Sequence, residues 1–258
     1  MLRQSCYREG RLVFSTMKDT EATGRVTISP VGFIRTPFDE KFAVPRQSSL
    51  VHHGHFEIFF YPPYDCEEAF NGIDEFSHLW ITFLFDRIPE DPVFRPMVRP
   101  PRLGGNTFKG VFATRSPFRP NRTGLSVVRL VEVKRYNGRV SLIIDGADMV
   151  NNTPVIDVKP YIKFVDSVPD AVSGFALEAP KMHKVVFSEK AMLQIKDSGV
   201  SDFKELIEEV LSQDPRPAYR TQQTDERVYG VGLCGFDVKW QARDEVIHVL
   251  YLEEGMPG

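Results

Sequence analysis

Two stretches of the chain combine Arg, Pro and Gly at a density that secondary-structure propensity does not explain. The first is KFAVPRQ at residues 41–47. The second lies within residues 98–126 and reads VRPPRLGGN and then GVFATRSPFRPNRTGLS. Prolines stiffen a loop, glycines let its backbone approach a ligand, and arginines present fixed bidentate donors to carboxylates and phosphates. The combination predicts a preformed pocket for an anionic or zwitterionic ligand.

The second stretch is also basic within an acidic chain. Residues 95–139 hold eleven basic residues and one acid, Glu132, so this segment carries +10 and the remainder −13 in a chain of net charge −3. A local basic surface on an acidic protein is typical of a phosphate-binding face. The alternative is a set of unrelated surface arginines.

Five histidines invite a chemical interpretation. His52, His53 and His55 are clustered, but no carboxylate or Cys stands at a convincing ligand spacing, so a solvated turn is favoured over a metal site. His78 and His248 sit inside apolar runs and are interpreted as core histidines rather than catalytic bases.

Residues 230–235 match the pattern G-x-G-x-x-G. A dinucleotide site needs a helix after this pattern, so that the amides of its N-terminus meet the pyrophosphate. The residues that follow alternate like a strand, and we therefore dismiss the motif as a cofactor loop.

The elements that must position these residues are strands. Segments rich in Val, Ile, Phe and Thr are separated by Pro, Gly, Asn and Asp, and Asn137-Gly138 predicts a tight hairpin turn. No long helical period intervenes, so an antiparallel barrel or sandwich is favoured over parallel βαβ units. The predicted strands are residues 26–34, 56–61, 78–85, 108–114, 125–133 and 139–144.

The pattern changes near residue 180. Residues 201–212 have the apolar spacing of one helical face and begin with Ser201 as the expected N-cap, and residues 188–196 form a shorter predicted helix. Residues 236–240 and 246–252 alternate as a hairpin. This predicts a mainly β chain with a small α+β appendage.

We expect an N-terminal extension over residues 1–25, expected to be flexible, a β domain over 26–178 and an α+β domain over 179–258. Whether residues 1–16 are native is left open, because Met17 precedes the first patterned segment. Three scattered cysteines argue against disulfides, and neither a secretory signal nor a membrane span is visible. These features indicate a cytoplasmic protein with no membrane partner.

Several long runs, in order between about residues 30 and 220, resemble the TrmO (TsaA/YaeB-like) family of tRNA methyltransferases. The family transfers a methyl group from S-adenosylmethionine to the exocyclic N6 of threonylcarbamoyladenosine next to the anticodon. The matching runs are PVGFIRTPFDEKFAVPRQ, EFSHLWITFLF, VRPPRLGGN, GVFATRSPFRPNRTGLS, NNTPVIDVKPY and QDPRPAYR.

The resemblance implies an antiparallel β-barrel that holds the donor, no metal, tRNA as substrate, and a homodimer with donor sites near the subunit interface. This chain departs from the family pattern at Asp86-Arg87 and Arg122-Thr123. The donor-binding positions that the resemblance implies are Pro45, Arg46, Gln47, Asp86, Arg87, Arg115, Leu125, Asp145, Gly146, Ala147 and Asp148.

The acceptor nitrogen must lose a proton, and Asp148, Asp157 and Asp214 are the candidate acceptors among which the sequence does not choose. The residues expected to contact tRNA are Arg119, Arg122, Arg216 and Tyr219.

Two other functions stay open. One is a non-enzymatic RNA- or nucleotide-binding β-barrel, which would share the basic segment. The other is a metal-dependent barrel enzyme that uses the three clustered histidines.

Overall fold

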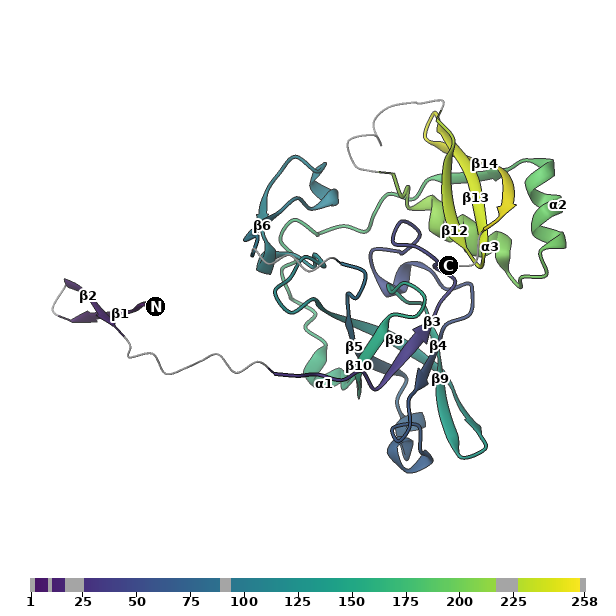
Figure 1. Cartoon of the computed structure of the whole chain (residues 1–258). Coiled ribbons are helices and arrows are strands. Elements are labelled where there is room, and N and C mark those ends of the chain that lie inside the picture. Colours follow the sequence, from purple (N-terminus) through teal and green to yellow (C-terminus); the bar gives the residue numbers. More distant parts are fainter. Residues whose placement is uncertain (1–2, 9–10, 17–25, 89–93, 217–226, 256–258) are drawn as a thin grey trace.

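The computed structural model describes residues 3–8, 11–16, 26–88, 94–216 and 227–255 (Figure 1). Two sheets form the body of the molecule, and the predicted mainly β character is confirmed. Strands β1 (Arg3–Arg8) and β2 (Arg11–Thr16) pair only with each other, and Figure 1 shows them apart from both main sheets. Among the described residues, no helix is long and apolar enough to cross a membrane.

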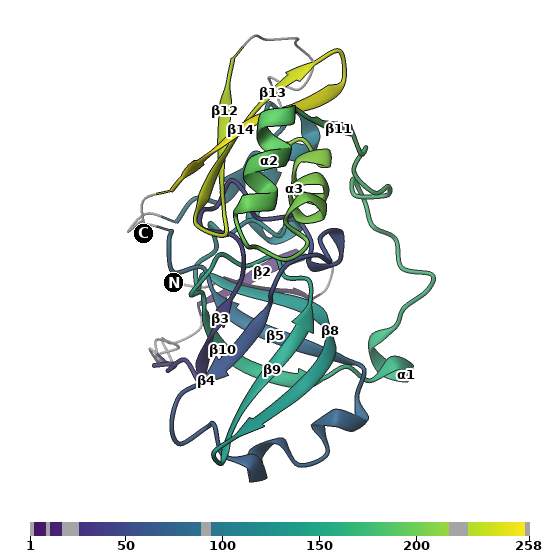
Figure 2. The same cartoon turned by 90° about the vertical axis from the view of Figure 1, so that its right-hand side faces the viewer.

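Six antiparallel strands form a closed barrel in the order β10-β3-β4-β9-β8-β5 (Figure 2). β10 pairs with both β3 and β5, and this double pairing closes the sheet. The strands are β3 (Gly32–Arg35), β4 (Glu57–Phe60), β5 (His78–Leu84), β8 (Thr123–Tyr136), β9 (Arg139–Asp145) and β10 (Pro154–Pro160).

The barrel follows from alternation along its strands. In β5, Leu79, Ile81 and Phe83 are buried, whereas the residues between them are half-buried. Successive side chains of a strand point to opposite faces, so this period of two turns one face into the core. The predicted Asn137-Gly138 turn joins β8 to β9, with φ of 52° and 72°, and is confirmed.

The second sheet has the order β11-β14-β13-β12, and α2 (Glu189–Asp197) and α3 (Phe203–Ser212) pack against it (Figure 2). Ser188 caps α2 by accepting a hydrogen bond from the Ala191 amide. The predicted Ser201 cap of α3 is wrong: Asp202 is the N-cap, at φ 52°. The strands are β11 (Lys184–Phe187), β12 (Tyr229–Leu233), β13 (Phe236–Arg243) and β14 (Val246–Glu254).

Other strand predictions need correction. Of residues 26–34, only the end belongs to β3. Of residues 108–114, only Lys109–Gly110 (β7) is extended; it pairs with β6 (Met97–Val98) and is followed by a 3-10 turn at Val111–Ala113. The strand β10 was not predicted, because prolines bound it at both ends, and neither was the short helix α1 (Lys163–Asp166).

The loop before β4 is locked between the barrel and α3. Its 3-10 turn, Ser48–Leu50, approaches Gly146 so closely that a Cβ there would lie 2.2 Å from the Ser48 carbonyl oxygen. The Ser48 hydroxyl donates to the Val127 carbonyl at 2.6 Å. On the other side, the amides of His52 and His53 donate to the Glu209 carboxylate at 2.7 and 2.9 Å. The loop that carries residues 45–47 therefore has a defined position.

Gly146→Ala is expected to destabilise the protein by about 3 kcal/mol or more, because it adds a backbone clash to the strain of φ +75°. Gly138→Ala is the matched control: its φ is +72°, but nothing lies within 4 Å of the added Cβ. It should cost only about 1–2 kcal/mol. Urea unfolding measures both, and equal losses would contradict the close approach.

Candidate functional site

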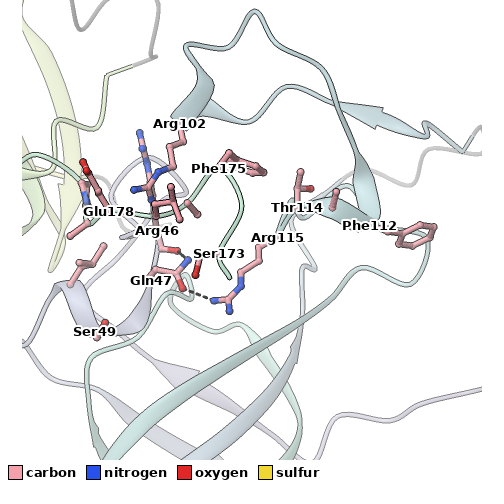
Figure 3. Close-up of a pocket in the computed structure, with 16 residues that line it drawn as sticks. Arg46, Gln47, Ser49, Arg102, Phe112, Thr114, Arg115, Ser173, Phe175 and Glu178 are labelled. Atoms are coloured by element: carbon pink, nitrogen blue, oxygen red, sulfur yellow. Dashed lines mark hydrogen bonds between the residues drawn. The ribbon is translucent and has the colours of Figure 1, made fainter. Parts of the chain in front are cut away.

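Two adjoining cavities lie beside the locked loop. One has a volume of about 610 Å³ and the other about 770 Å³, a size suited to a small-molecule ligand. Arg46, Gln47, Thr114 and Arg115 line both cavities, so the two share a wall. Figure 3 shows the larger one, with Arg102 near Arg46 and with Arg115 joined to Gln47.

Three guanidinium groups surround these cavities without a carboxylate partner. Arg46, Arg102 and Arg115 form no ion pair within 4.0 Å in the part of the chain that the structure describes. Arg115 instead donates to the Gln47 side-chain oxygen at 2.6 Å. Burial and the neighbouring charge of Arg102 lower the pKa of Arg46, against the attraction of Asp214. An anion placed among these groups would relieve their mutual repulsion.

Asp148 brings a carboxyl group to the smaller of the two cavities. Burial raises its pKa, although the Ser126 hydroxyl donates to its Oδ1 at 2.5 Å. Asp148 also lines a neighbouring cavity of about 200 Å³. A carboxylate with a raised pKa is a better proton acceptor than an exposed one.

An aromatic wall completes the 610 Å³ cavity. The ring of Phe83 lies over Gly124, where a Cβ would come within 2.2 Å of it, so only glycine fits opposite this ring. Phe85 packs edge-on against Phe83 at 5.1 Å.

Six of the predicted donor positions are brought together. They all line the 610 Å³ cavity, and they are Pro45, Arg46, Gln47, Arg115, Leu125 and Asp148.

Asp86 and Arg87 do not line that cavity but the 200 Å³ cavity beside it. The Arg87 guanidinium donates to the carbonyls of Asp39 at 2.9 Å and Asn151 at 2.7 Å, and Lys41 donates to the Arg87 carbonyl. The Arg87 side chain therefore ties loops together.

The remaining donor positions lie elsewhere. Hydrogen bonds from His52 and Arg129 hold the pKa of Asp145 low, against the opposing effect of its burial. Gly146 faces the 48–51 loop, and Ala147 is fully buried. None of these three residues lines the cavities described above.

The other two candidate proton acceptors occupy different environments. Asp157 is half-exposed on β10 and pairs with Lys159 at 2.9 Å, away from the cavities. Asp214 forms a buried ion pair with Arg216 at 2.8 Å, with side chains only 4% and 5% exposed. This pair lines a cavity of about 260 Å³ that also includes Arg46. Asp214 is therefore near the site but already neutralised by a guanidinium.

The residues predicted to contact tRNA do not form one group in the structure. Arg119 lines the 610 Å³ cavity and donates to the Thr114 carbonyl at 2.7 Å, whereas Arg122 donates to the Ile88 carbonyl at 3.0 Å. Arg216 is buried, and Tyr219 lies outside the described residues.

The basic segment divides into two parts. Its last residues pair with acids of neighbouring elements: Arg129 with Asp145, Lys134 with Glu57, Arg135 with Asp74 and Arg139 with Asp65. Within the described ranges, Arg102 and Arg115 form no ion pair and line the cavities. Counting charges along the chain therefore overstates the basic face.

The clustered histidines face three different carboxylates. His52 contacts Asp145 at 2.9 Å, and His53 contacts Glu209 and His55 contacts Glu57, both at 2.8 Å. The hydrogen bond to Glu209 raises the pKa of His53. The described ranges hold no group of three or more His, Cys, Asp or Glu side chains able to bind a metal ion.

His78 and His248 are half-buried rather than fully enclosed in the core. Residues 230–235 belong to the hairpin of β12 and β13, so the helix that a dinucleotide loop needs is replaced by a strand, as predicted.

Sequence reasoning missed two residues of the site. Arg102 lines the 770 Å³ cavity and Trp80 the 610 Å³ cavity. Arg102 stands within VRPPRLGGN, and Trp80 follows the outward-facing alternation of its strand. The sequence therefore marks both residues, but it does not show which cavity the side chain of each one lines.

The described residues form a closed antiparallel barrel with two cavities lined by Arg46, Arg102 and Arg115, an arrangement suited to an anionic or zwitterionic ligand. The family model described as the tRNA-methyltransferase O N-terminal domain matches residues 33–167, and the TrmO C-terminal domain model matches residues 180–255. The chain belongs to the tRNA-methyltransferase O family.

Comparison with individual proteins points to the same family. The chain is 45% identical to the tRNA (adenine(37)-N6)-methyltransferase of Escherichia coli (strain K12), over 86% of this chain and 96% of that protein. It is 44% identical to a putative S-adenosylmethionine-dependent methyltransferase, RcsF, of Pseudomonas aeruginosa, over 89% and 98%. A crystal structure of TrmO from Pseudomonas aeruginosa superimposes with a TM-score of 0.70 at 36% identity, covering 89% of this chain and 99% of that one.

Arg216→Ala is expected to cost about 3–5 kcal/mol of stability, because it leaves the Asp214 carboxylate buried without its partner. Chemical denaturation measures the loss. Replacing Asp214 with Asn and Arg216 with Leu should destabilise less than Arg216→Ala alone, since the unpaired buried carboxylate is removed and Asn tolerates the φ of 46° at position 214. If Arg216→Ala unfolds like the unsubstituted chain, the pair is not buried in solution.

Proposed function

We propose that this chain is an S-adenosylmethionine-dependent methyltransferase that methylates the exocyclic N6 of threonylcarbamoyladenosine next to the anticodon of tRNA. The observation that carries this proposal is the group of unpaired guanidiniums around two adjoining cavities, with Asp148 at one of them. The names of the relatives support the methyl donor and the adenine of tRNA.

The residues present fit a zwitterionic donor. The 610 Å³ cavity combines Arg115 with an aromatic wall, so it can take a carboxylate at one end and a flat ring elsewhere. When bound, S-adenosylmethionine supplies an electrophilic methyl group on a positively charged sulfur, which leaves as a neutral thioether. Because that sulfur is already an activated leaving group, the transfer we propose needs no metal.

Asp148 is the proton acceptor in this proposal. As the acceptor nitrogen bonds to the methyl carbon, the carbon–sulfur bond breaks, its electron pair stays on sulfur, and the N6 proton must leave. The raised pKa of Asp148 suits it to take this proton, and Ser126 orients its carboxylate. Otherwise the chain mainly aligns donor and nucleophile, and orientation contributes roughly 7–11 kcal/mol where geometry is ideal.

The 770 Å³ cavity is our proposed acceptor site. Arg102 lines this cavity, forms no ion pair with any described residue, and suits the threonyl carboxylate of the modified adenosine. We assign the tRNA contacts to Arg119 and Arg122, which are half-buried, and to Tyr219, and we leave out Arg216 because it is buried. Binding of tRNA should weaken steeply as salt increases, and a flat salt dependence would remove this assignment.

We further propose two domains, a donor-holding barrel over residues 26–178 and an appendage over residues 179–258, preceded by an extension over residues 1–25. We propose that the chain functions in the cytoplasm, where its tRNA substrate would be found.

A homodimer is part of the proposal. Large apolar side chains are exposed on residues 112–177: Phe112 is 72% exposed, Phe164 88%, Val172 91% and Leu177 75%. Exposed apolar groups of this size are typical of protein interfaces. Phe112 and Leu177 also line the 770 Å³ cavity, so a second copy covering them would close it. Sedimentation equilibrium tests this, and a purely monomeric chain would contradict it.

Incubation with labelled S-adenosylmethionine and tRNA, with or without the threonylcarbamoyl group, tests the function. We expect label only in the modified tRNA. Binding of both tRNAs with no label in either would instead support the non-enzymatic RNA-binding barrel.

Arg115→Ala should abolish detectable donor binding in calorimetry, because it removes the guanidinium shared by both cavities. Arg139→Ala is the control: this arginine belongs to the same basic segment but pairs with Asp65. Its donor affinity should be unchanged. If Arg115→Ala binds the donor as tightly as the unsubstituted protein, Arg115 is not part of the donor site.

Asp148→Asn should lower kcat by about 100-fold or more, because the amide cannot accept the proton. In the unsubstituted enzyme, kcat should rise with pH as the Asp148 carboxyl ionises, above the ordinary pKa of an Asp, and this limb should disappear in the variant. Asp157→Asn, which alters an exposed carboxylate, should keep both the rate and the pH limb. An unchanged profile in Asp148→Asn would exclude Asp148 as the base.

A further inference from the structure

Trp80 stands on the outer face of the barrel. In β5 the buried residues alternate with half-buried ones, so Trp80 and Thr82 point away from the core that holds Leu79 and Ile81. Both outward residues line the 610 Å³ cavity. An indole ring therefore forms part of the wall of the proposed donor cavity.

The orientation of this ring is set from outside the barrel. The indole N–H donates to Asp166 Oδ2 at 3.0 Å, and the same oxygen accepts the Ile162 amide at 2.8 Å. The Tyr161 ring packs against Trp80 at 5.9 Å, tilted by 40°. Because α1 occupies the one polar atom of the indole, the ring has no hydrogen bond left to offer a ligand. It contributes an apolar π surface.

We propose that Trp80 is the stacking surface for an adenine ring in the 610 Å³ cavity, and that Asp166 is the residue that positions it. This inference rests on the proposed function and names the group that the cavity binds. Indole faces stack well on nucleobases, and a fixed ring loses little entropy on binding. Residues 145–147, expected from the family resemblance to contribute to the donor site, do not line this cavity, whereas Trp80 does.

The adenine belongs to the donor rather than to the acceptor nucleoside. Both molecules contain this ring, but Trp80 shares its cavity with Pro45, Leu125 and Asp148, which are proposed donor positions. The 770 Å³ cavity, which holds Arg102, does not include Trp80 among its lining residues. The hydroxyls of Thr82 and Thr123 line the same cavity as Trp80 and offer donors and acceptors for ring nitrogens.

Tryptophan fluorescence during titration with S-adenosylhomocysteine tests this directly. The chain has two tryptophans, and the second, Trp240, is fully buried in the other sheet. We expect quenching in the unsubstituted protein and in Trp240→Phe, and its loss in Trp80→Phe. Asp166→Ala, which removes the acceptor of the indole N–H, should shift the Trp80 emission and reduce the quenching amplitude, which a change in stability alone would not do.

Calorimetry with S-adenosylhomocysteine supplies the affinities. Trp80→Ala should weaken binding about 5- to 100-fold, the usual range for losing one base stack, and Trp80→Phe should weaken it much less. Lys159→Ala is the control, since Lys159 pairs with Trp80 across β10 and β5 but does not line the cavity. Its affinity should match that of the unsubstituted protein. If Trp80→Ala fails to fold, the stacking role is tested by whether the quenching is lost in Trp80→Phe.

A failure of the stacking role and a failure of the proposed function give different experimental results. If the unsubstituted protein binds S-adenosylhomocysteine and Trp80→Ala binds it equally well, the stacking role is overturned and the proposed function stands. If the unsubstituted protein does not bind S-adenosylhomocysteine, the proposed function fails with it. If a threonylcarbamoylated anticodon stem-loop alone quenches Trp80 while S-adenosylhomocysteine does not, the assignment to the donor is overturned.

Discussion

The site depends on the close approach of the 48–51 loop to Gly146. The absence of a side chain lets the Ser48 and Val51 carbonyls come within van der Waals reach of that backbone. The same loop is joined to β8 through Ser48 and to α3 through the Glu209 carboxylate. Contacts on both sides hold the preceding residues, among them Arg46, at the mouth of two cavities. Without this packing, Arg46 would not be held beside the cavities that Arg102 and Arg115 line.

Electrostatics then separates the arginines of the chain into two groups. Those on the later part of β8 are matched with carboxylates, as Arg129 is with Asp145. Among the described residues, Arg46, Arg102 and Arg115 form no ion pair, and burial, followed by the charge of Arg102, lowers the pKa of Arg46. Like charges held close together cost free energy, and an anion bound between them lowers that cost. The cavities therefore hold positive charge that a bound anion can neutralise, whereas the basic residues of the β8–β9 hairpin already pair with carboxylates.

The carboxylates divide in the same way. Asp214 is buried but matched by Arg216, so its charge is neutralised in place. Asp148 is half-buried, its carboxylate accepts a hydrogen bond from the Ser126 hydroxyl, and burial raises its pKa. The two acids therefore have different surroundings: Asp214 lies in a buried ion pair, whereas burial raises the pKa of Asp148 against the Ser126 hydrogen bond and the charge of Arg115.

Local pattern alone determined the strands with strict alternation, such as 78–84, the turn at Asn137-Gly138 and the α+β character of the C-terminal part. It also marked residues 41–47 and 98–126 as a ligand pocket, because Arg, Pro and Gly have the same chemistry in any fold, and the family resemblance selected residues 45–47 and Arg115 within them. Only the tertiary structure decided that β10 closes the sheet, that Asp148 and not Asp145 reaches the cavity, and that Asp166 holds Trp80. These outcomes depend on pairings between residues far apart in the chain. Which side chain such a pairing buries, neutralises or orients is not encoded in the spacing of nearby residues.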